Sequence, residues 1–265
     1  MKIDMRSTYN LINECMDHVK RLKRNPLVWN PFLDDIRMRL SWNSNTLEGN
    51  TLSLDETIAL INYDEVTAGH TYTEYQEAKG MYQAVSEKLN FEKTEKIDCA
   101  WIKKCNALIL FSDGNFRKNN LYIGTVSEAV YYPPAYEKVE GLMSGYVRDL
   151  EMKDEGDIES VICKIAENHI KFERIHPFPD GNGRTGRMIM NQQLLNYGVL
   201  PAIIKDQSKY RQAFRRYEKN GELALMEYVI AEGIVETYGK LRQIEEKYIK
   251  ALGISEKEAG ELKNS

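Results

Sequence analysis

Between two apolar segments of the chain stands the stretch HPFPDGNGRTGR, residues 176–187. Before it, apolar residues recur at helical spacing from Ile158 to Phe172, which predicts an amphipathic helix. Pro177 is expected to end that helix, because the residue before a proline is pushed out of the helical region. After it, residues 188–195 are apolar on more than one side and predict a central, buried helix. The polar residues of the stretch therefore stand at a turn between two helices.

This turn contains the residue types that a phosphate site requires. Glycines let the backbone approach an anion, and the free N–H groups of a helix's first turn point toward it. Arg184 and Arg187 reach toward the same helix end, and guanidinium groups bind phosphate oxygens in pairs. Asp180 is a single carboxylate of the kind that holds Mg²⁺ beside phosphates. His176 supplies a base with a pKa near neutrality for a hydroxyl nucleophile. A solvated turn explains any one of these residues, but not the whole set.

These residues resemble the motif H-P-F-x-D-G-N-G-R-x-x-R of the Fic family, and every specified position matches. The resemblance implies a helical enzyme that transfers AMP from ATP to a hydroxyl side chain of a protein. By position, His176 would be the catalytic base and Asp180 the ligand of Mg²⁺ or Mn²⁺. The nucleotide would be bound by the other motif residues, Gly181, Asn182, Gly183, Arg184, Thr185, Gly186 and Arg187.

The N-terminal quarter of the chain predicts helices broken by short connections. Residues 1–30 have a helical pattern, Pro26, Asn30 and Pro31 indicate a connection, and residues 32–40 resume the pattern. Ser44 is a residue type that caps a helical turn, and Gly49 is one that ends it in a left-handed conformation. A capping box over residues 53–56 then starts the next helix.

The segment SNTLEGN, residues 44–50, also resembles the Fic family's inhibitory motif, S/T-x-x-x-E-G/N-N. The resemblance implies an N-terminal inhibitory helix near residues 44–49, with Ser44 and Glu48 as regulatory residues. In that subgroup the glutamate pairs with the second motif arginine, which is Arg187 here. Without the downstream motif, an exposed Glu48 on a short connector would be the simpler interpretation.

One stretch of the chain reads convincingly as strands. Residues 121–136 are rich in β-branched and aromatic residues and end at two prolines, which predicts a small hairpin. Its position resembles the Fic flap, which aligns a target by adding backbone hydrogen bonds to an extended segment. The active part of the flap would be Glu128, Ala129, Val130 and Tyr131. A purely structural hairpin explains any single residue there equally well.

Composition excludes some classes of protein and leaves others. With 42% hydrophobic and 29% charged residues, the chain is an ordinary globular protein. A net charge of −4 offers no basic surface, so no nucleic-acid partner is expected. The four cysteines lack metal spacing and are expected to be reduced thiols. Without a signal-like or membrane-length apolar run, no membrane partner and a cytoplasmic location are expected.

Together the patterns and the resemblance predict an all-α, Fic-like helical domain over residues 1–253, with one small β-hairpin flap and a C-terminal tail over residues 254–265. Tyr210 stands where the family places aromatic residues beside adenine, so it is expected to contact the nucleotide; a core position is the alternative.

The predicted function is protein adenylylation, autoinhibited by Glu48. AMP would pass from Mg-ATP to a Tyr, Ser or Thr hydroxyl of a target protein, which can be the chain itself. Removal of AMP, or transfer of another nucleotide or phosphoryl group at the same site, remains open. So do a non-catalytic, nucleotide-binding regulator and a homodimer.

Overall fold

The computed structural model describes residues 5–125, 128–151 and 156–253, and it divides the chain into two compact units. One unit is Ser41–Tyr197, and the other combines Met1–Leu40 with Gly198–Ser265. The described residues are mostly helical, which confirms the predicted all-α class. The expected tail over residues 254–265 lies outside the described residues, and the single domain over residues 1–253 stays a prediction.

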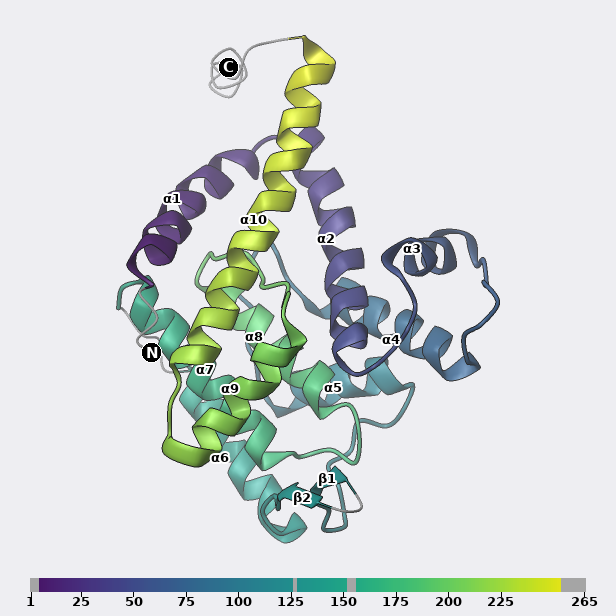
Figure 1. Cartoon of the computed structure of the whole chain (residues 1–265), viewed down its shortest axis with the longest axis vertical. Coiled ribbons are helices and arrows are strands. Elements are labelled where there is room, and N and C mark those ends of the chain that lie inside the picture. Colours follow the sequence, from purple (N-terminus) through teal and green to yellow (C-terminus); the bar gives the residue numbers. More distant parts are fainter. Residues whose placement is uncertain (1–4, 126–127, 152–155, 254–265) are drawn as a thin grey trace. The chain divides into compact units, whose positions relative to one another are not determined.

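The unit Ser41–Tyr197 is built around helix α8. Helices α5 and α7 both pack against α8, α4 packs on α5, and α6 packs on α7 (Figure 1). Helix α8 is buried along almost its whole length, as its apolar pattern predicts. The helices of this unit after residue 50 are α3 (Leu54–Tyr63), α4 (Tyr72–Lys88), α5 (Cys99–Leu110), the 3₁₀ turn η1 (Tyr136–Lys138), α6 (Val139–Glu151), α7 (Ile158–Ile175) and α8 (Asn182–Asn196).

The predicted hairpin is present in the same unit. Strand β1 (Ile123–Thr125) pairs antiparallel with β2 (Glu128–Tyr131), so that Ile123 lies opposite Tyr131 and Thr125 opposite Glu128. The register shifts between Ile123 and Gly124, which is the irregularity of a β-bulge. The hairpin is thus short and locally bent.

The other unit is formed by α1 (Arg6–Leu22), the first part of α2 (Pro26–Leu47), α9 (Gln207–Asn220) and α10 (Ala224–Leu252). Helix α10 packs against both α1 and α9, and Figure 1 shows α1 beside it. Polar contacts join α1 to α10: His18 Nδ1 lies 2.7 Å from the Tyr238 hydroxyl and Nε2 lies 3.2 Å from Glu245 Oε1.

The connection expected around Pro26, Asn30 and Pro31 is wrong, because α2 runs without a break from Pro26 to Leu47. Pro26 occupies the first helical position, where its missing N–H is not needed. Pro31 lies inside the helix, where a proline removes one backbone hydrogen bond. The side chains of Val28, Phe32 and Ile36 are fully buried, and their burial on one face outweighs that local cost.

The expected cap at Ser44 is also wrong, since Ser44 lies inside α2 rather than at its start. Gly49 follows the end of α2 with φ of 101°, a conformation that favours glycine. The capping box before α3 is confirmed: Glu56 N donates to Ser53 Oγ at 3.2 Å, and Ser53 N donates to Glu56 Oε2 at 2.8 Å. Local cap chemistry was therefore predicted correctly at one helix end and not at the other.

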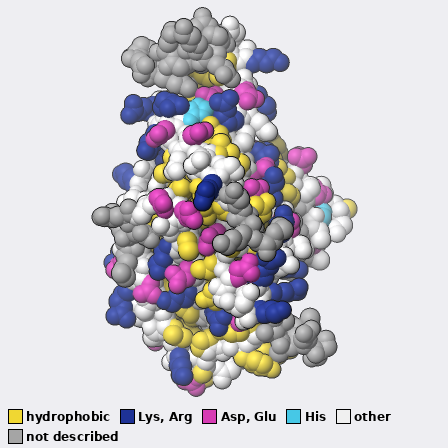
Figure 2. Space-filling view, turned by 60° about the vertical axis from the view of Figure 1, so that its left-hand side comes forward, with side chains coloured by type: hydrophobic (Ala, Val, Ile, Leu, Met, Phe, Trp, Pro, Cys, Tyr) yellow, Lys and Arg dark blue, Asp and Glu magenta, His cyan; other side chains and the backbone are white. Residues whose placement is uncertain are grey.

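On the face in Figure 2, Lys and Arg side chains are interspersed with Asp and Glu. Within the described ranges, no helix combines the length and the apolar character that crossing a bilayer requires.

Candidate active site

The motif turn lies between the end of α7 and the start of α8. Gly181 is the residue before α8 and adopts a left-handed conformation with φ of 73°. The Asn182 side chain fixes the turn, since its Oδ1 accepts from Phe178 N and its Nδ2 donates to Phe178 O, both at 2.9 Å. Asn106 of α5 also stabilises the turn, because its Nδ2 donates to Asp180 O at 3.0 Å and to Thr185 Oγ1 at 3.2 Å.

The start of α8 suits an anion because no side chain caps it. Gly181 at the N-cap position has no side chain to satisfy the first N–H groups of the helix. Those groups and the helix dipole together favour a bound phosphate or carboxylate. In this structure a carboxylate is close: a Cβ built on Gly183 would lie 2.3 Å from Glu48 Oε1.

His176 is the C-cap residue of α7 and has the left-handed φ of 48°. Its Nδ1 lies 3.3 Å from Glu173 O. A carbonyl oxygen only accepts, so Nδ1 carries the proton and Nε2 keeps its lone pair. Burial lowers the pKa of His176, and the positive charge of Arg117 lowers it further, against opposing effects of Glu173 O, Glu48 and Asp180. The imidazole is therefore neutral near pH 7, with Nε2 available as a base.

Asp180 has the environment of a ligand for a hydrated metal ion. Its side chain is 74% exposed, Oδ1 accepts from Gly181 N at 2.6 Å, and Arg184 Nη2 lies 3.8 Å away. Among the described residues, no three His, Cys, Asp or Glu side chains form a cluster that would enclose a metal. Mg²⁺ commonly uses one or two carboxylates and substrate phosphates and keeps its other waters. Asp180 fits that mode of binding, whereas a metal held by protein ligands alone does not fit.

Arg187 contacts the end of α2 through several hydrogen bonds. Its Nε donates to Ser44 Oγ at 3.0 Å, and its Nη2 donates to Ser44 O at 2.9 Å and to Glu48 Oε1 at 2.6 Å. The Arg187 side chain is 4% exposed and that of Glu48 is 39% exposed. The expected pairing of Glu48 with Arg187 is thus present, and Ser44 contributes to it as an acceptor.

Arg184 meets a different carboxylate, Glu77 of α4. Arg184 Nη1 donates to Glu77 Oε1 at 3.0 Å, while its Nε is buried without a hydrogen-bond partner in the described part of the chain. Glu77 Oε2 accepts from Asn50 Nδ2 at 3.0 Å, and Glu77 O accepts from Asn45 Nδ2 at 3.0 Å. Helix α4 therefore holds the segment around Glu48 from one side, and Arg187 holds it from the other.

The hairpin is anchored next to the end of α7. The Tyr131 hydroxyl donates to Arg174 O at 3.2 Å, and the Arg174 guanidinium carbon lies 5.1 Å from the centre of the Tyr131 ring. The backbones of Glu128, Ala129 and Val130 form the rest of β2, and their role as a flap stays a prediction. Through the Tyr131 contact, β2 lies next to Arg174, which precedes His176 by two residues along the chain.

Residues 96–194 match the family model described as Fic/DOC family. This segment is therefore similar to that family. Among similar curated proteins, "Protein adenylyltransferase Fic" of Nematostella vectensis is 30% identical over 64% of this chain and 40% of that protein. The protein of the same name from Drosophila melanogaster is 32% identical over 64% of this chain and 35% of that protein. The chain therefore spans less than half the length of these relatives.

Solved structures with Fic domains have the same fold. A Fic domain containing signaling protein from Bacteroides thetaiotaomicron covers 94% of this chain, and 98% of its own length, with a TM-score of 0.71 and 21% identity. Fic-1 (aa134 - 508) from C. elegans covers 90% of this chain and 71% of its own length, with a TM-score of 0.74 and 23% identity. At these identities the likeness shows the fold alone.

The Fic motif residues, Ser44, Glu48 and Tyr131 come together in the unit Ser41–Tyr197, but Tyr210 belongs to the other unit. Tyr210 lies on α9, is 6% exposed and packs its ring at 5.1 Å from Phe214. Its expected contact with adenine stays a prediction.

Sequence reasoning missed three polar residues that contact the Fic motif: Glu77, Asn106 and Arg117. Asn106 had a detectable signal, because it is a lone amide among the buried residues of α5 such as Ile102, Cys105 and Ile109. Glu77 and Arg117 stand among other charged residues, so nothing in the local pattern separates them from a solvated face.

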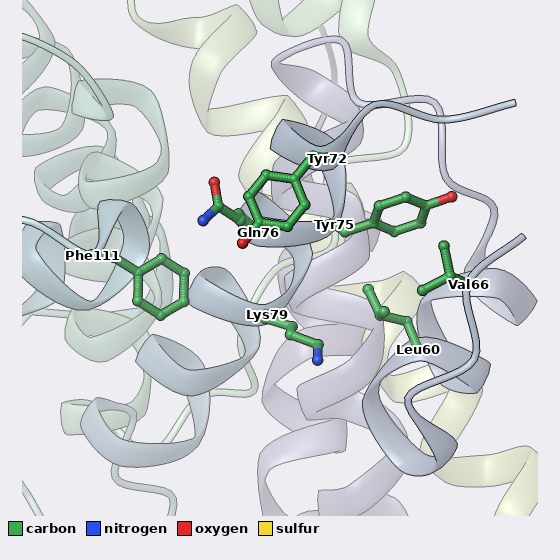
Figure 3. A pocket seen from close by; sticks show the side chains of 7 residues that line it. All are labelled: Leu60, Val66, Tyr72, Tyr75, Gln76, Lys79 and Phe111. Carbon is green, nitrogen blue, oxygen red and sulfur yellow. The ribbon is translucent and has the colours of Figure 1, made fainter. Parts of the chain in front are cut away.

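A shallow hollow of about 490 Å³ lies on the same unit and involves none of the Fic motif residues. Figure 3 shows its lining side chains, which come from α3, α4, the loop between them and the end of α5. They are mainly apolar or aromatic: Leu60, Val66, Tyr72, Tyr75, Gln76, Lys79 and Phe111.

Proposed function

We propose that the chain is a protein adenylyltransferase, transferring AMP from ATP to a hydroxyl side chain of a protein, and that Glu48 restrains it. One arrangement carries the proposal: the free Nε2 of His176 stands beside a helix start that offers N–H groups and two buried guanidinium groups. The names of the relatives from Nematostella vectensis and Drosophila melanogaster support the same reaction.

The chemistry follows from these groups. The target's hydroxyl oxygen attacks the α-phosphorus of ATP and passes its proton to His176 Nε2. A bond from oxygen to the α-phosphorus forms, the bond to the β-phosphate oxygen breaks, and pyrophosphate leaves with that electron pair. The N–H groups of α8 and the arginines Arg184 and Arg187 hold the phosphates in line for this displacement. When a magnesium ion is bound at Asp180, it neutralises negative charge on the phosphate oxygens.

The flap would present the target. A β-strand with a free edge can pair with an extended segment of another chain, and main-chain hydrogen bonds then fix the position of the segment. The β2 backbone from Glu128 to Tyr131 would take this role. Because such pairing uses main-chain hydrogen bonds and does not depend on the target's side chains, the modified residue can be Tyr, Ser or Thr.

The restraint is a competition for Arg187. In this structure its Nε and Nη2 donate to Ser44 and Glu48, and Glu48 Oε1 lies over Gly183 at the start of α8. A γ-phosphate that reaches Arg187 must displace a carboxylate from the same donors. We therefore propose that ATP binds productively only after the end of α2 has loosened.

The test is label transfer from ATP to protein by the full chain and by its Glu48→Gly variant. Label from α-labelled but not γ-labelled ATP should appear on protein, with self-modification as the readout when no target is known. The transfer should disappear when His176→Ala is added to the Glu48→Gly variant. Label from γ-labelled ATP would instead indicate phosphoryl transfer, and no labelling with normal ATP binding would favour a non-catalytic regulator.

A second activity at the same site is favoured by the exposure of Glu48. Its carboxylate is 39% exposed although Oε1 holds Arg187, so it reaches solvent close to the motif. We propose that it can direct a water molecule at an AMP-modified hydroxyl and release AMP. Modified protein should then lose AMP faster with wild-type chain than with Glu48→Gly; the reverse order would exclude this role.

A further inference from the structure

Arg117 is a buried arginine in the loop between α5 and β1, and it has an unusual set of partners. Arg117 is 4% exposed, and its guanidinium donates to three main-chain carbonyls. Nε donates to His176 O at 2.9 Å, Nη1 to Asn119 O at 3.0 Å, and Nη2 to Pro134 O. No carboxylate forms an ion pair with it among the residues that the structure describes. The negative charge of Glu137 partly offsets the burial of Arg117, but the direct partners of its guanidinium are neutral carbonyls, so its position calls for an explanation beyond packing.

The three carbonyls belong to two different parts of the site. Asn119 precedes strand β1 and Pro134 follows strand β2, so these two hydrogen bonds hold the two ends of the hairpin. The third partner is the carbonyl of His176. The main chain of Arg117 adds a fourth bond, because its N–H donates to Pro177 O at 2.9 Å. One residue therefore joins both ends of the flap to the backbone of the base.

The hydrogen bond from Arg117 to His176 O stabilises an uncommon main-chain conformation. His176 has φ of 48°, which is uncommon for a residue other than glycine and persists where the surroundings enforce it. The Arg117 hydrogen bonds to His176 O and Pro177 O lie on the two peptide groups that follow this dihedral angle. They therefore help to fix the direction in which the imidazole points.

We propose that Arg117 is a positioning residue for AMP transfer, holding the flap and the His176 base at a fixed separation. The inference rests on the proposed transferase function. The flap sets where the target's hydroxyl lies, and His176 must receive the proton of that hydroxyl. Because a misplacement of about 1 Å can cost on the order of 100-fold in rate, a shared anchor for the two parts matters more for turnover than for nucleotide binding.

The charge of Arg117 gives the test a signature that simple loss of structure lacks. The charged groups that act on His176 are Arg117, which lowers its pKa, and Glu48 and Asp180, which raise it. In a Glu48→Gly background, Arg117 and Asp180 remain. Replacing Arg117 by methionine removes a lowering effect, so the pKa of His176 should rise. A lysine at the same position keeps the charge but cannot reach three carbonyls with a planar fork.

The experiment compares Arg117→Met and Arg117→Lys with the matched surface control Lys118→Met, all in the full chain carrying Glu48→Gly. ATP affinity should change less than about threefold, whereas single-turnover label transfer should fall at least about tenfold in both Arg117 variants. The acid limb of the rate–pH profile should move to higher pH in Arg117→Met and stay in place in Arg117→Lys. The Lys118→Met control should match its parent in every measurement, since Lys118 is exposed.

Two readouts separate the possible failures. If the Glu48→Gly parent transfers no label, the proposed function fails, and the positioning role falls with it as a role in transfer. If the parent transfers label and both Arg117 variants transfer it equally fast, only the role of Arg117 is refuted. Amide hydrogen exchange checks the link without using activity: flap amides should exchange faster in Arg117→Met than in the parent. Unchanged exchange with a slower transfer rate would also overturn the proposed link.

Discussion

Arg184 and Arg187 stand about one turn apart on α8, and each is 3% exposed and meets a carboxylate. Their surroundings nevertheless differ. Arg187 donates to the side chain and the carbonyl of Ser44 and to Glu48, so two of its nitrogens are engaged by the end of α2. Arg184 donates to Glu77 through Nη1, and its buried Nε lacks a hydrogen-bond partner among the described residues. The end of α2 therefore occupies donors of Arg187, whereas Arg184 is held by Glu77 of α4.

The largest effect is expected from the loss of His176, the proposed catalytic base. In the Glu48→Gly chain, His176→Ala should lower label transfer by about 10²–10⁴-fold, because general base catalysis is typically worth that much. Nucleotide affinity should remain, because the proposed binding groups are the arginines and the start of α8. Single-turnover transfer and equilibrium ATP binding measure the two quantities. Parallel loss of affinity and transfer would mean that His176 helps to hold the nucleotide, which contradicts its role as a base.

Release of Arg187 should give the next largest change. Glu48→Gly should raise label transfer at least about tenfold, since a tenfold change corresponds to only about 1.4 kcal/mol and a desolvated charge pair can exceed that. Glu48→Gln is the matched control, because it keeps the length of the side chain and removes its charge. Its transfer rate should lie between those of wild type and Glu48→Gly. Equal labelling of wild type and Glu48→Gly would refute the restraint.

Glu77→Gln tests the contact between Glu77 and Arg184. Glu77 accepts from Arg184 through Oε1 and from Asn50 through Oε2, and an amide can accept through only one of these atoms. The loosened Asn50 contact should raise transfer about fivefold in the wild-type background, which is the effect of one hydrogen bond of roughly 1 kcal/mol. In the Glu48→Gly background no increase is expected, because the restraint is already gone. An increase in both backgrounds would mean that Glu77 inhibits through Arg184 itself.

The smallest effect concerns a third carboxylate near Arg187. The Glu173 Oε1 atom is buried without a hydrogen-bond partner among the described residues, and a Cβ on Gly186 would lie 2.3 Å from it. Burial raises the pKa of Glu173 from 4.5 to about 8; Arg187 opposes this rise and Glu48 adds to it. Between these two pH values the folded chain keeps a proton that the unfolded chain releases. The free energy of unfolding should therefore fall as pH rises through this window.

Urea denaturation of wild type and Glu173→Gln measures this loss between pH 6.5 and pH 8. The buried His169, whose pKa is lowered from 6.5 to about 3, mainly by burial, is present in both proteins, so its titration cancels in the difference between them. The stability of wild type relative to Glu173→Gln should decrease across the range. In the Glu48→Gly background the decrease should be smaller, because Glu48 no longer raises the pKa of Glu173. A difference between the two proteins that stays constant with pH would contradict a protonated Glu173.

Local patterns predicted the parts of the site whose chemistry is local. The turn at residues 176–187, the helices on either side, the hairpin and the capping box at Ser53 all follow from neighbouring residues, and all are present. The pairing of Glu48 with Arg187 was expected only through the resemblance, because 139 residues separate the partners. Two errors also have non-local causes. Burial of Val28, Phe32 and Ile36 keeps α2 continuous across Pro31, and Ser44 accepts from Arg187 instead of capping a turn.

The contacts through which other residues position the motif could not be predicted from the sequence for the same reason. Asn106 contacts Asp180 across 74 residues of chain, Glu77 contacts Arg184 across 107, and Arg117 contacts His176 across 59. Asn106 and Arg117 donate to main-chain carbonyls and Glu77 accepts from a single Arg184 nitrogen, so each position depends on the folded path of the backbone. The residue types at Glu77 and Arg117 are ordinary for helix surfaces and loops, whereas Asn106 stands out as an amide among the apolar residues of α5.

Gly183 lies between the proposed catalytic motif and the proposed restraining residue Glu48, which bears on how such a chain can evolve. Even a methyl group at this position would meet Glu48 Oε1 at 2.3 Å, so a larger residue would push the restraining carboxylate away. The same methyl group would stand where phosphate must approach the backbone of α8. A change at Gly183 is thus expected to remove the restraint and the activity together. Variants that are permanently active should therefore arise in residues 44–50, while the motif itself remains unchanged.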